Sequence, residues 1–289
     1  MKKMLLSIIM LACSATATAQ ERFSLFVGSD INDVRRMLQA TGLRDGDFVI
    51  DLGSGDGRIV LEAARMNPKV TGVGVEIDRK LVDESAATAQ TEKLAARVKF
   101  LHQNAFDADL RNASVITMWL FPELMRMLRP KILAEAAPGT RVVTRIWDLG
   151  VWKADLTDEA WPYIYVWVVP ARVAGYWTWQ LPFDRVSHTY SAVIEQYFQN
   201  AEGVVRAGNR RGILEEMKLS GPEISFNLSL TVGDKSPVVH RFNGLVTGDT
   251  IEGTVSVLYK PNEKPYVLPW RAVRAQSTTY FAPTGLGSR

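Results

Sequence analysis

The sequence predicts an α/β fold, with a doubly wound, mostly parallel sheet followed by an antiparallel all-β barrel or sandwich. Before residue 172, apolar strand-like runs alternate with helical patterns, which is typical of a parallel sheet covered on both faces. From residue 184 onward, apolar and polar residues alternate with a period of two, which is typical of antiparallel strands. We therefore expect a leader at 1–19, a first domain at 20–172 and a β-rich domain at 173–289.

The elements of the first half follow from hydrophobic periodicity and from stop signals such as Pro68, which ends a helix. Strands buried on both faces are expected to be almost continuously apolar, as in "FVIDL", "VTGVGVEI" and "SVITMWL". In chain order we expect helix 31–43, strand 48–51, helix 58–66, strand 70–77, helix 79–95, strands 98–102 and 115–120, helix 122–137 and strand 141–146.

Two aromatic segments follow, "YIYVWVVPA" and "VAGYWTWQL", and we expect them to form an antiparallel pair that closes one edge of this sheet. The alternating segments "YSAVIEQYF", "ISFNLSLTV", "VVHRFNGLV" and "TIEGTVSVLY" predict the second sheet. Gly244, Gly248 and Gly253 punctuate these strands, and glycine within a strand commonly marks a bulge or bend. These glycines favour a barrel over a flat sandwich.

The first twenty residues, "MKKMLLSIIMLACSATATAQ", have the three parts of a secretory signal peptide. Two lysines precede a nine-residue apolar run, and small residues ending at Ala19 provide a cleavage point. The run is shorter than the roughly 20 residues that span a membrane. We expect cleavage after Ala19 and export to the periplasm or the medium. A lipidated Cys13 and an uncleaved anchor are the open alternatives.

Composition excludes several classes of function. Cys13 is the only cysteine, so the mature chain would have no thiol chemistry. The histidines are far apart in sequence and show no metal-ligand spacing, so no metal is expected: His102, His188 and His240. Without the two leader lysines, 32 of the 34 basic residues remain against 31 acidic ones, with no basic cluster. A nucleic-acid partner is not indicated.

The stretch "VIDLGSGDGR", at 49–58, puts three glycines and three charged residues into the turn after an apolar strand. The dinucleotide fingerprint G-x-G-x-x-G requires glycine at position 58, where this chain has Arg58. A pyrophosphate would also meet Asp51 and Asp56, at a cost of about 1 to 4 kcal/mol for charges about 4 Å apart. A ligand with an ammonium and a carboxylate suits the turn better. S-adenosylmethionine has such an end, with glycine N–H groups for its carboxylate and Asp51 for its ammonium.

Two further strand ends offer groups for the rest of that ligand. Glu76 ends the second strand and can accept hydrogen bonds from both ribose hydroxyls, while Asn104 and Ala105 follow the third strand and face the adenine. Asn104 is equally well explained as a turn residue. Asp56 and Arg58 are expected to pair with each other near the first helical turn.

The segments "DLGSGDGR", "GVGVEID" and "VITMWLFPELMRMLRPKIL" resemble class I S-adenosylmethionine-dependent methyltransferases, over roughly residues 25 to 170. More narrowly, they resemble the group that contains the lysine methyltransferase of the ATP synthase c subunit and its bacterial relatives. The resemblance implies a Rossmann-like sheet and S-adenosyl-L-methionine as cofactor. The implied cofactor-binding residues are Asp51, Gly53, Ser54, Gly55, Gly57, Glu76, Asn104 and Ala105. The segment "FVGSDINDV" departs from the family's Pro-Thr pattern, and Ser29 or Asp30 is expected to cap its helix.

Methyl transfer is an in-line displacement, so positioning the nucleophile matters more than an acid–base pair. In this fold the loop "MWLFPE" faces the methyl group, which makes Trp119, Phe121 and Pro122 the substrate-side candidates. Trp119 fits a strand core equally well. The loop lacks the Asp/Asn-Pro-Pro-aromatic pattern of nucleobase methyltransferases. We expect transfer to an amine, with a protein lysine as the first candidate and a small molecule as the alternative. A non-catalytic exported protein that binds a ligand in its β-domain is the competing hypothesis.

Overall fold

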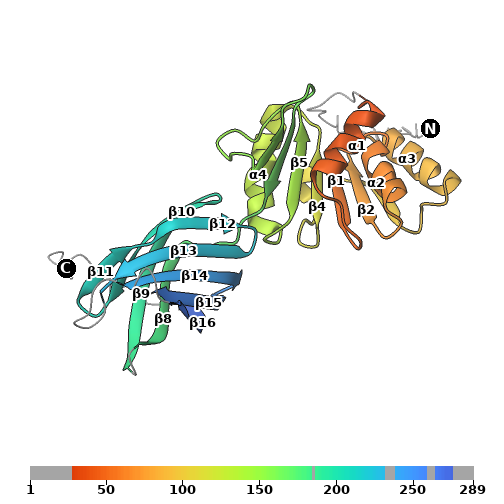
Figure 1. Cartoon of the computed structure of the whole chain (residues 1–289). Helices are drawn as coiled ribbons and strands as arrows, with labels where there is room; N and C mark the ends of the chain where they lie inside the picture. Colours follow the sequence, from red (N-terminus) through yellow and green to blue (C-terminus); the bar gives the residue numbers. More distant parts are fainter. Residues whose placement is uncertain (1–27, 184–185, 232–237, 259–263, 276–289) are drawn as a thin grey trace, which may run out of the picture.

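The computed structural model describes residues 28–183, 186–231, 238–258 and 264–275, so the predicted leader and Cys13 lie outside the described residues. Two sheets account for all the strands of these ranges. Figure 1 shows the second sheet on the side of the first where α4 and β5 lie, away from α3.

The first sheet is mixed, with seven strands in the order β3-β2-β1-β4-β5-β7-β6. Five neighbouring strands run parallel, and β7 lies antiparallel between β5 and β6. Their bounds are β1 Phe48–Leu52, β2 Thr71–Glu76, β3 Val98–His102, β4 Val115–Met118, β5 Arg141–Arg145, β6 Leu156–Asp158 and β7 Ile164–Val168. The strand order reverses between β1 and β4, where ligands bind in open α/β sheets.

Helices cover both faces of this sheet, and their bounds are α1 Ile31–Ala40, α2 Arg58–Met66, α3 Arg79–Thr91 and α4 Pro122–Glu135, with a short 3-10 turn, η1, at Ala105–Asp107. On one face, α1 and α2 share a core with Val49 and Val115. On the other face, α4 packs Met125 and Leu128 against Ile50. The strands bury both of their sides, which explains their continuous apolar sequence.

Three helices, α1, α3 and α4, end earlier than expected, and after the first two the chain turns into the left-handed region. After α1, Gly42 has a φ of 61°, and after α3, Lys93 has a φ of 58°. The amide of Leu94 donates to the carbonyl of Ala89, as in a helix C-terminal turn. At the start of α1, Asp30 is the N-cap and accepts from the amide of Asn32.

The expected pairing of the two aromatic segments is wrong. β7 pairs with β5 and β6, whereas the next strand, β8, begins the second sheet. After β7 the chain leaves the first sheet, and the amide of Ala171 donates to the carbonyl of Gly221, in the turn between β12 and β13. The outer position beside β7 is taken by β6, which has three residues and an exposed Leu156 and is too short for a periodicity signal.

The second sheet has nine antiparallel strands in the order β11-β10-β9-β8-β16-β15-β14-β13-β12, and it is nearly closed into a barrel. Its bounds are β8 Gly175–Phe183, β9 Val186–Tyr197, β10 Asn200–Ala207, β11 Arg210–Ile213, β12 Glu215–Ser220, β13 Glu223–Leu230, β14 Val238–Thr247, β15 Thr250–Leu258 and β16 Tyr266–Arg274. Trp179 stacks on Tyr190 inside it, with ring centroids 5.4 Å apart. Gly244 pairs with Gly253, where a Cβ on Gly253 would lie 2.0 Å from the carbonyl oxygen of Asn243.

One pair of neighbouring strands in the second sheet is hydrogen-bonded over only a few residues. β8 and β16 pair only from Ala272 to Arg274, opposite Trp179 to Trp177. Continuing that register would put Pro182 opposite Pro269, and neither proline has an N–H to donate to a ladder. The two strands therefore diverge beyond this point.

Candidate active site

The glycine loop follows β1 at the edge where the five parallel strands end. Gly53, Gly55 and Gly57 have φ angles of 80°, 54° and 78°, a left-handed region that only glycine enters without strain. The amides of Gly53 and Ser54 both donate to the carbonyl of Val75, at 2.8 and 3.0 Å. These bonds fold the loop onto the end of β2.

One aliphatic and one aromatic side chain pack directly on the loop's glycines. A Cβ on Gly53 would lie 2.4 Å from the Leu120 side chain, and a Cβ on Gly57 would lie 2.5 Å from Phe100. A Cβ added to Gly74, in β2, would lie 2.5 Å from the same Phe100 ring. The loop follows β1 and is hydrogen-bonded to β2. Side chains from β3 and from the segment after β4 pack on it, so four strands set its position.

Asp51 lies at the end of β1 and is 1% exposed. Its Oδ1 accepts a 2.6 Å hydrogen bond from the hydroxyl of Thr117, which is its register partner on β4. Its Oδ2 is buried and has no hydrogen-bond partner. Burial raises the pKa of the Asp51 carboxyl to about 7; the Thr117 bond opposes this, and the charges of Glu76 and Asp56 add to it.

Glu76 ends β2 and turns its carboxylate toward the glycine loop. Oε2 accepts from the amide of Gly55 at 2.9 Å. Oε1 accepts from the amides of Ile77 and Asp78, at 2.8 and 2.9 Å. Three backbone donors thus fix this carboxylate at the strand end and use three of its four lone-pair sites, which leaves one site, on Oε2, for a further donor.

Asn104 caps the turn η1. Its Oδ1 accepts from the amide of Phe106 at 3.0 Å, which is the local turn role that its sequence position also allowed. Ala105, the first residue of the turn, is partly buried. The segment lies beyond the end of β3, next to Glu76, since the amide of Gln103 donates to the Glu76 carbonyl at 3.0 Å.

Asp56 and Arg58 pair with each other, as expected, with an Nη2 to Oδ2 distance of 2.5 Å. The Arg58 guanidinium also donates to the carbonyl of Ser29, just before α1. The pair therefore ties the segment before α1 to the glycine loop. This gives the two residues a structural role at the site.

The substrate-side candidates follow β4 and differ in exposure. Trp119 is partly buried, and the guanidinium carbon of Arg145 lies 4.5 Å from its ring centroid. Arg145 is held in turn by Asp33 of α1, at 2.6 Å. Phe121 is 48% exposed, and Pro122 is the first residue of α4. Trp119 is thus neither a core residue nor an open aromatic face, because a cation of the protein already covers one side of the ring.

Comparisons with known proteins bear on this geometry. Residues 51–156 match the profile of the ANTKMT methyltransferase domain. A protein-lysine N-methyltransferase from Saccharolobus islandicus (strain REY15A) is 38% identical over 120 residues, which cover 42% of this chain and 74% of that relative. The chain belongs to the ANTKMT methyltransferase family. It is an enzyme of the methyltransferase class, and its cofactor is S-adenosyl-L-methionine.

Other relatives of this methyltransferase match the same region. The adenine nucleotide translocase lysine N-methyltransferase of Mus musculus is 31% identical over 143 residues, covering 48% of this chain. The chain spans 62% of that relative, less than two thirds of its length. The crystal structure of an RNA methyltransferase from Salinibacter ruber, in complex with S-adenosyl-L-homocysteine, is 38% identical; it covers 51% of this chain and 96% of its own, with a TM-score of 0.49. The profile match ends before the second sheet begins.

The residues of the methyltransferase site suit the cofactor's amino-acid end. Two buried side-chain atoms at the glycine loop have no hydrogen-bond partner, Oδ2 of Asp51 and Oγ of Ser54. A buried carboxylate oxygen without a donor is matched by an ammonium group. The loop amides of Gly53, Ser54, Gly55 and Gly57 donate to protein oxygens, so their expected contact with the cofactor carboxylate requires an exchange of partners. When bound, the cofactor supplies an electrophilic methyl group.

Three site residues were missed from the sequence. Thr117 is a polar residue within the apolar run "VITM". This interruption is the only feature of the sequence that could have indicated a role at the site. Ser85 of α3 is fully buried, and its hydroxyl lies 2.7 Å from the carbonyl oxygen of Leu81 in its own helix and 3.2 Å from that of Gly55. Arg145 ends β5, and nothing in its sequence position indicated that it would cross to Trp119.

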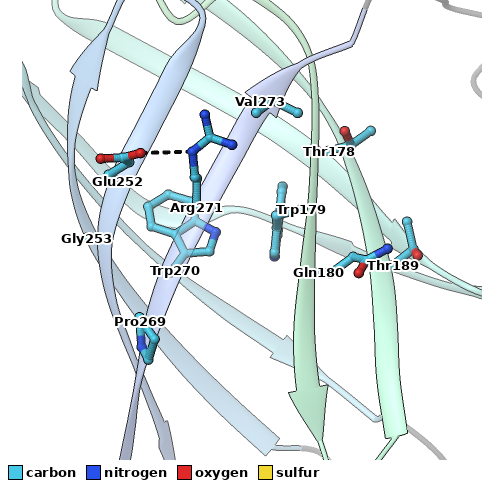
Figure 2. A pocket seen from close by; sticks show the side chains of 10 residues that line it. All are labelled: Thr178, Trp179, Gln180, Thr189, Glu252, Gly253, Pro269, Trp270, Arg271 and Val273. Atoms are coloured by element: carbon cyan, nitrogen blue, oxygen red, sulfur yellow. Dashed lines mark hydrogen bonds and ion pairs between the residues drawn. The ribbon is translucent and has the colours of Figure 1, made fainter.

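A separate groove of about 680 Å³ lies on the second sheet, where β8 and β16 diverge (Figure 2). Trp179 and Trp270 lie between the two strands, and Glu252 and Arg271 form an ion pair at 2.8 Å. The groove lies in the second sheet and holds none of the site residues at the strand ends.

Among the described residues, no group of histidine, cysteine and carboxylate side chains is arranged to hold a metal ion. The helices within the described ranges include none with the length and apolarity needed to cross a membrane.

Proposed function

We propose that this methyltransferase transfers the methyl group of S-adenosyl-L-methionine to the side-chain amine of a lysine in a protein. The observation that carries the proposal is the 38% identity to the protein-lysine N-methyltransferase of Saccharolobus islandicus. The mouse relative is likewise a lysine N-methyltransferase by name. The strand-end carboxylates of Asp51 and Glu76 support the cofactor half of the proposal.

The proposed cofactor contacts follow the strand order. Asp51 meets the ammonium, Glu76 accepts from the ribose hydroxyls, and Asn104 with Ala105 lies at the adenine. Gly53, Ser54, Gly55 and Gly57 shape the loop around the methionine end. This arrangement is a doubly wound, Rossmann-like site in which β1, β2 and β3 each provide one part.

The acceptor lysine attacks only as the neutral amine, because the ammonium form has no lone pair. Its nitrogen forms a bond to the methyl carbon, the carbon–sulfur bond breaks with its electron pair on sulfur, and the extra amine proton leaves to solvent. Trp119, Phe121 and Pro122 form an apolar approach that favours the neutral amine.

The test uses the full chain with labelled methyl donor and an envelope protein extract from its host, followed by mass spectrometry of modified peptides. We expect methyl groups on lysine side chains, and none with the Asp51→Ala variant. Asp109→Asn, an exposed substitution far from the glycine loop in sequence, is the matched control and should retain activity. Methyl groups confined to small molecules in the extract would support the alternative acceptor class instead.

We also propose that residues 1–19 form a leader for export, followed by domains at 20–172 and 173–289. The charge, apolar run and small residues of the leader support export. Fractionation of the tagged chain tests this proposal. Recovery of the protein with its leader intact in the cytosol would contradict it, and recovery in the membrane fraction would indicate an anchor or a lipidated Cys13.

A further inference from the structure

We infer that the tip of the β9–β10 hairpin positions the loop that borders the acceptor side of the active site. We call residues 146–155 the acceptor-side loop; they connect β5 with β6. The hairpin tip, Phe198 and Gln199, belongs to the second sheet. The inference rests on the proposed function, because it assigns the second sheet a part in acceptor methylation.

The acceptor-side loop starts at the strand end that carries Arg145. Two residues on, the carbonyl of Trp147 accepts a 2.6 Å hydrogen bond from the hydroxyl of Thr144. The Trp147 side chain is 48% exposed, and Arg145 lies on the ring of Trp119. The loop therefore continues directly from the residue that lies against the substrate-side candidate Trp119.

The other end of the loop contacts the hairpin tip. Trp152 is fully buried, and its ring stacks on Phe198 with centroids 5.9 Å apart and an interplanar angle of 16°. The Gln199 side-chain amide donates to the carbonyl of Lys153 at 2.8 Å. The carbonyl of Trp152 accepts from the indole of Trp167 on β7 at 2.8 Å. Trp152 is thus packed between the two sheets.

Arg129 of α4 joins the middle of the loop to the same tip. Its guanidinium donates to the carbonyl of Leu149 at 2.6 Å, and its guanidinium carbon lies 5.6 Å from the centroid of the Phe198 ring. Gly150, next in the loop, has a φ of 73°, and its amide donates to the side chain of Asp148 at 2.9 Å. The Phe198 ring therefore contacts a side chain that holds the loop as well as the loop itself.

Phe198 is the first residue of the two-residue turn between β9 and β10, a position where hairpin turns require a positive φ. Its φ is 56°, in the left-handed region, which disfavours a large side chain. The side-chain amide of Gln196 donates to the carbonyl of Phe198 at 2.7 Å and to that of Ala171 at 2.9 Å. The turn thus sets the backbone of Phe198, and Trp152 and Arg129 contact its ring.

The experiment measures hydrogen exchange of the full chain by mass spectrometry, for the wild type and for Phe198→Ala and Gln199→Ala. We expect peptides covering 147–153 to exchange about three- to tenfold faster in Phe198→Ala, with a smaller effect in Gln199→Ala. Peptides of α1 to α3 should be unchanged. Ile213→Ala, on β11 and 60% exposed, is the control and should leave the loop's exchange at the wild-type rate.

Kinetics provide a second readout in the same variants. The KM for the acceptor should rise about three- to tenfold in Phe198→Ala, while the cofactor Kd stays constant because Asp51 and Glu76 lie on β1 and β2. Phe198→Tyr, which keeps the ring, should restore both exchange and KM. If Phe198→Ala does not fold, Phe198→Leu takes its place.

Unchanged exchange at 147–153 in both hairpin variants would overturn the inference, and so would a cofactor Kd that changes as much as the acceptor KM. Absence of lysine methylation by the wild type would remove the proposed function alone. The exchange measurement would then still decide whether the hairpin tip holds the loop.

Discussion

Asp51 is the residue that we propose to meet the ammonium of the cofactor. Its carboxylate is buried, one oxygen has no partner, and burial raises its pKa to about 7. Below that pH the group is largely neutral and loses its attraction for an ammonium. The negative charge that would attract the ammonium is thus fully present only above about pH 7, because burial in the cofactor-free protein disfavours it.

We expect the cofactor association constant to increase up to tenfold per pH unit on the acid side of about pH 7 and to level off above it, since only ionised Asp51 attracts the ammonium. Titration calorimetry across this range measures the effect. Asp51→Asn should bind weakly at every pH, whereas Asp109→Asn should follow the wild-type curve. An affinity that does not depend on pH in the wild type would show that Asp51 does not meet the ammonium.

The same carboxyl makes the stability of the cofactor-free protein depend on pH. The pKa of Asp51 is raised from 3.8 to about 7 on folding, so the folded chain binds this proton more tightly than the unfolded chain. The resulting stabilisation is complete below about pH 4 and is lost as the pH rises through about 7. We expect Asp51→Asn to abolish this component, which thermal unfolding at several pH values measures. An identical pH profile for the wild type and Asp51→Asn would contradict the raised pKa.

Among the elements, the start of β5 is tied to the end of α1 and to the segment before β1 by the buried side chain of Arg141. Arg141 and Asp47 are 2.5 Å apart with side chains 10% and 8% exposed, and Arg141 also donates to the carbonyls of Thr41 and Gly42. This contact connects the end of α1 to the start of β5. The Asp33 to Arg145 pair connects the same two elements at the opposite end, next to Trp119.

Asp47→Ala should lower the free energy of unfolding by about 3 to 5 kcal/mol, because it leaves the Arg141 guanidinium buried without its carboxylate. Denaturant titration measures this change. Asp45→Ala removes a comparable carboxylate from an exposed pair with Lys69, with side chains 63% and 70% exposed, and should have little effect. Equal losses in both variants would mean that the burial of the Arg141 pair contributes nothing.

Arg145→Gln removes the cation from the Trp119 ring and frees that ring to move. We expect the KM for the acceptor to rise about two- to fivefold, the size of a partly exposed cation–π contact, with the cofactor Kd unchanged. Arg79→Gln, which loses an exposed pair on α3, should leave both constants at their wild-type values. A changed cofactor Kd alone would place Arg145 on the cofactor side.

At the scale of the whole molecule, β14 and β15 of the second sheet approach each other at Gly253 more closely than a side chain allows. Gly253→Ala should lower the free energy of unfolding by about 1 to 3 kcal/mol or more, because its Cβ would collide with a backbone carbonyl. Denaturation followed by tryptophan fluorescence measures this. Gly248→Ala, where a Cβ meets open space, should lose only the roughly 1 kcal/mol that a left-handed alanine costs.

Much of the first sheet was predictable because its elements obey local rules. Strands such as β3 and helices such as α2 have their expected bounds, since an apolar run or a helical face ends where a glycine, proline or charged cluster begins. Strand β6 and the partner of β7 were not predictable. A three-residue strand is too short to show a periodic pattern. Whether β7 pairs with β6 or with β8 depends on how the strands assemble into the two sheets.

The sequence by itself determined the alternating first half, the glycine turn with its acidic residues, and the acidic end of the second strand, because each depends on local conformation or on residue type. Only the tertiary structure decided that Thr117 meets Asp51, that Arg145 covers Trp119, and that Phe198 reaches the loop after β5. Those pairs are separated by between 26 and 66 positions. Contacts over such separations follow from the packing of complete sheets and helices, for which no local pattern exists.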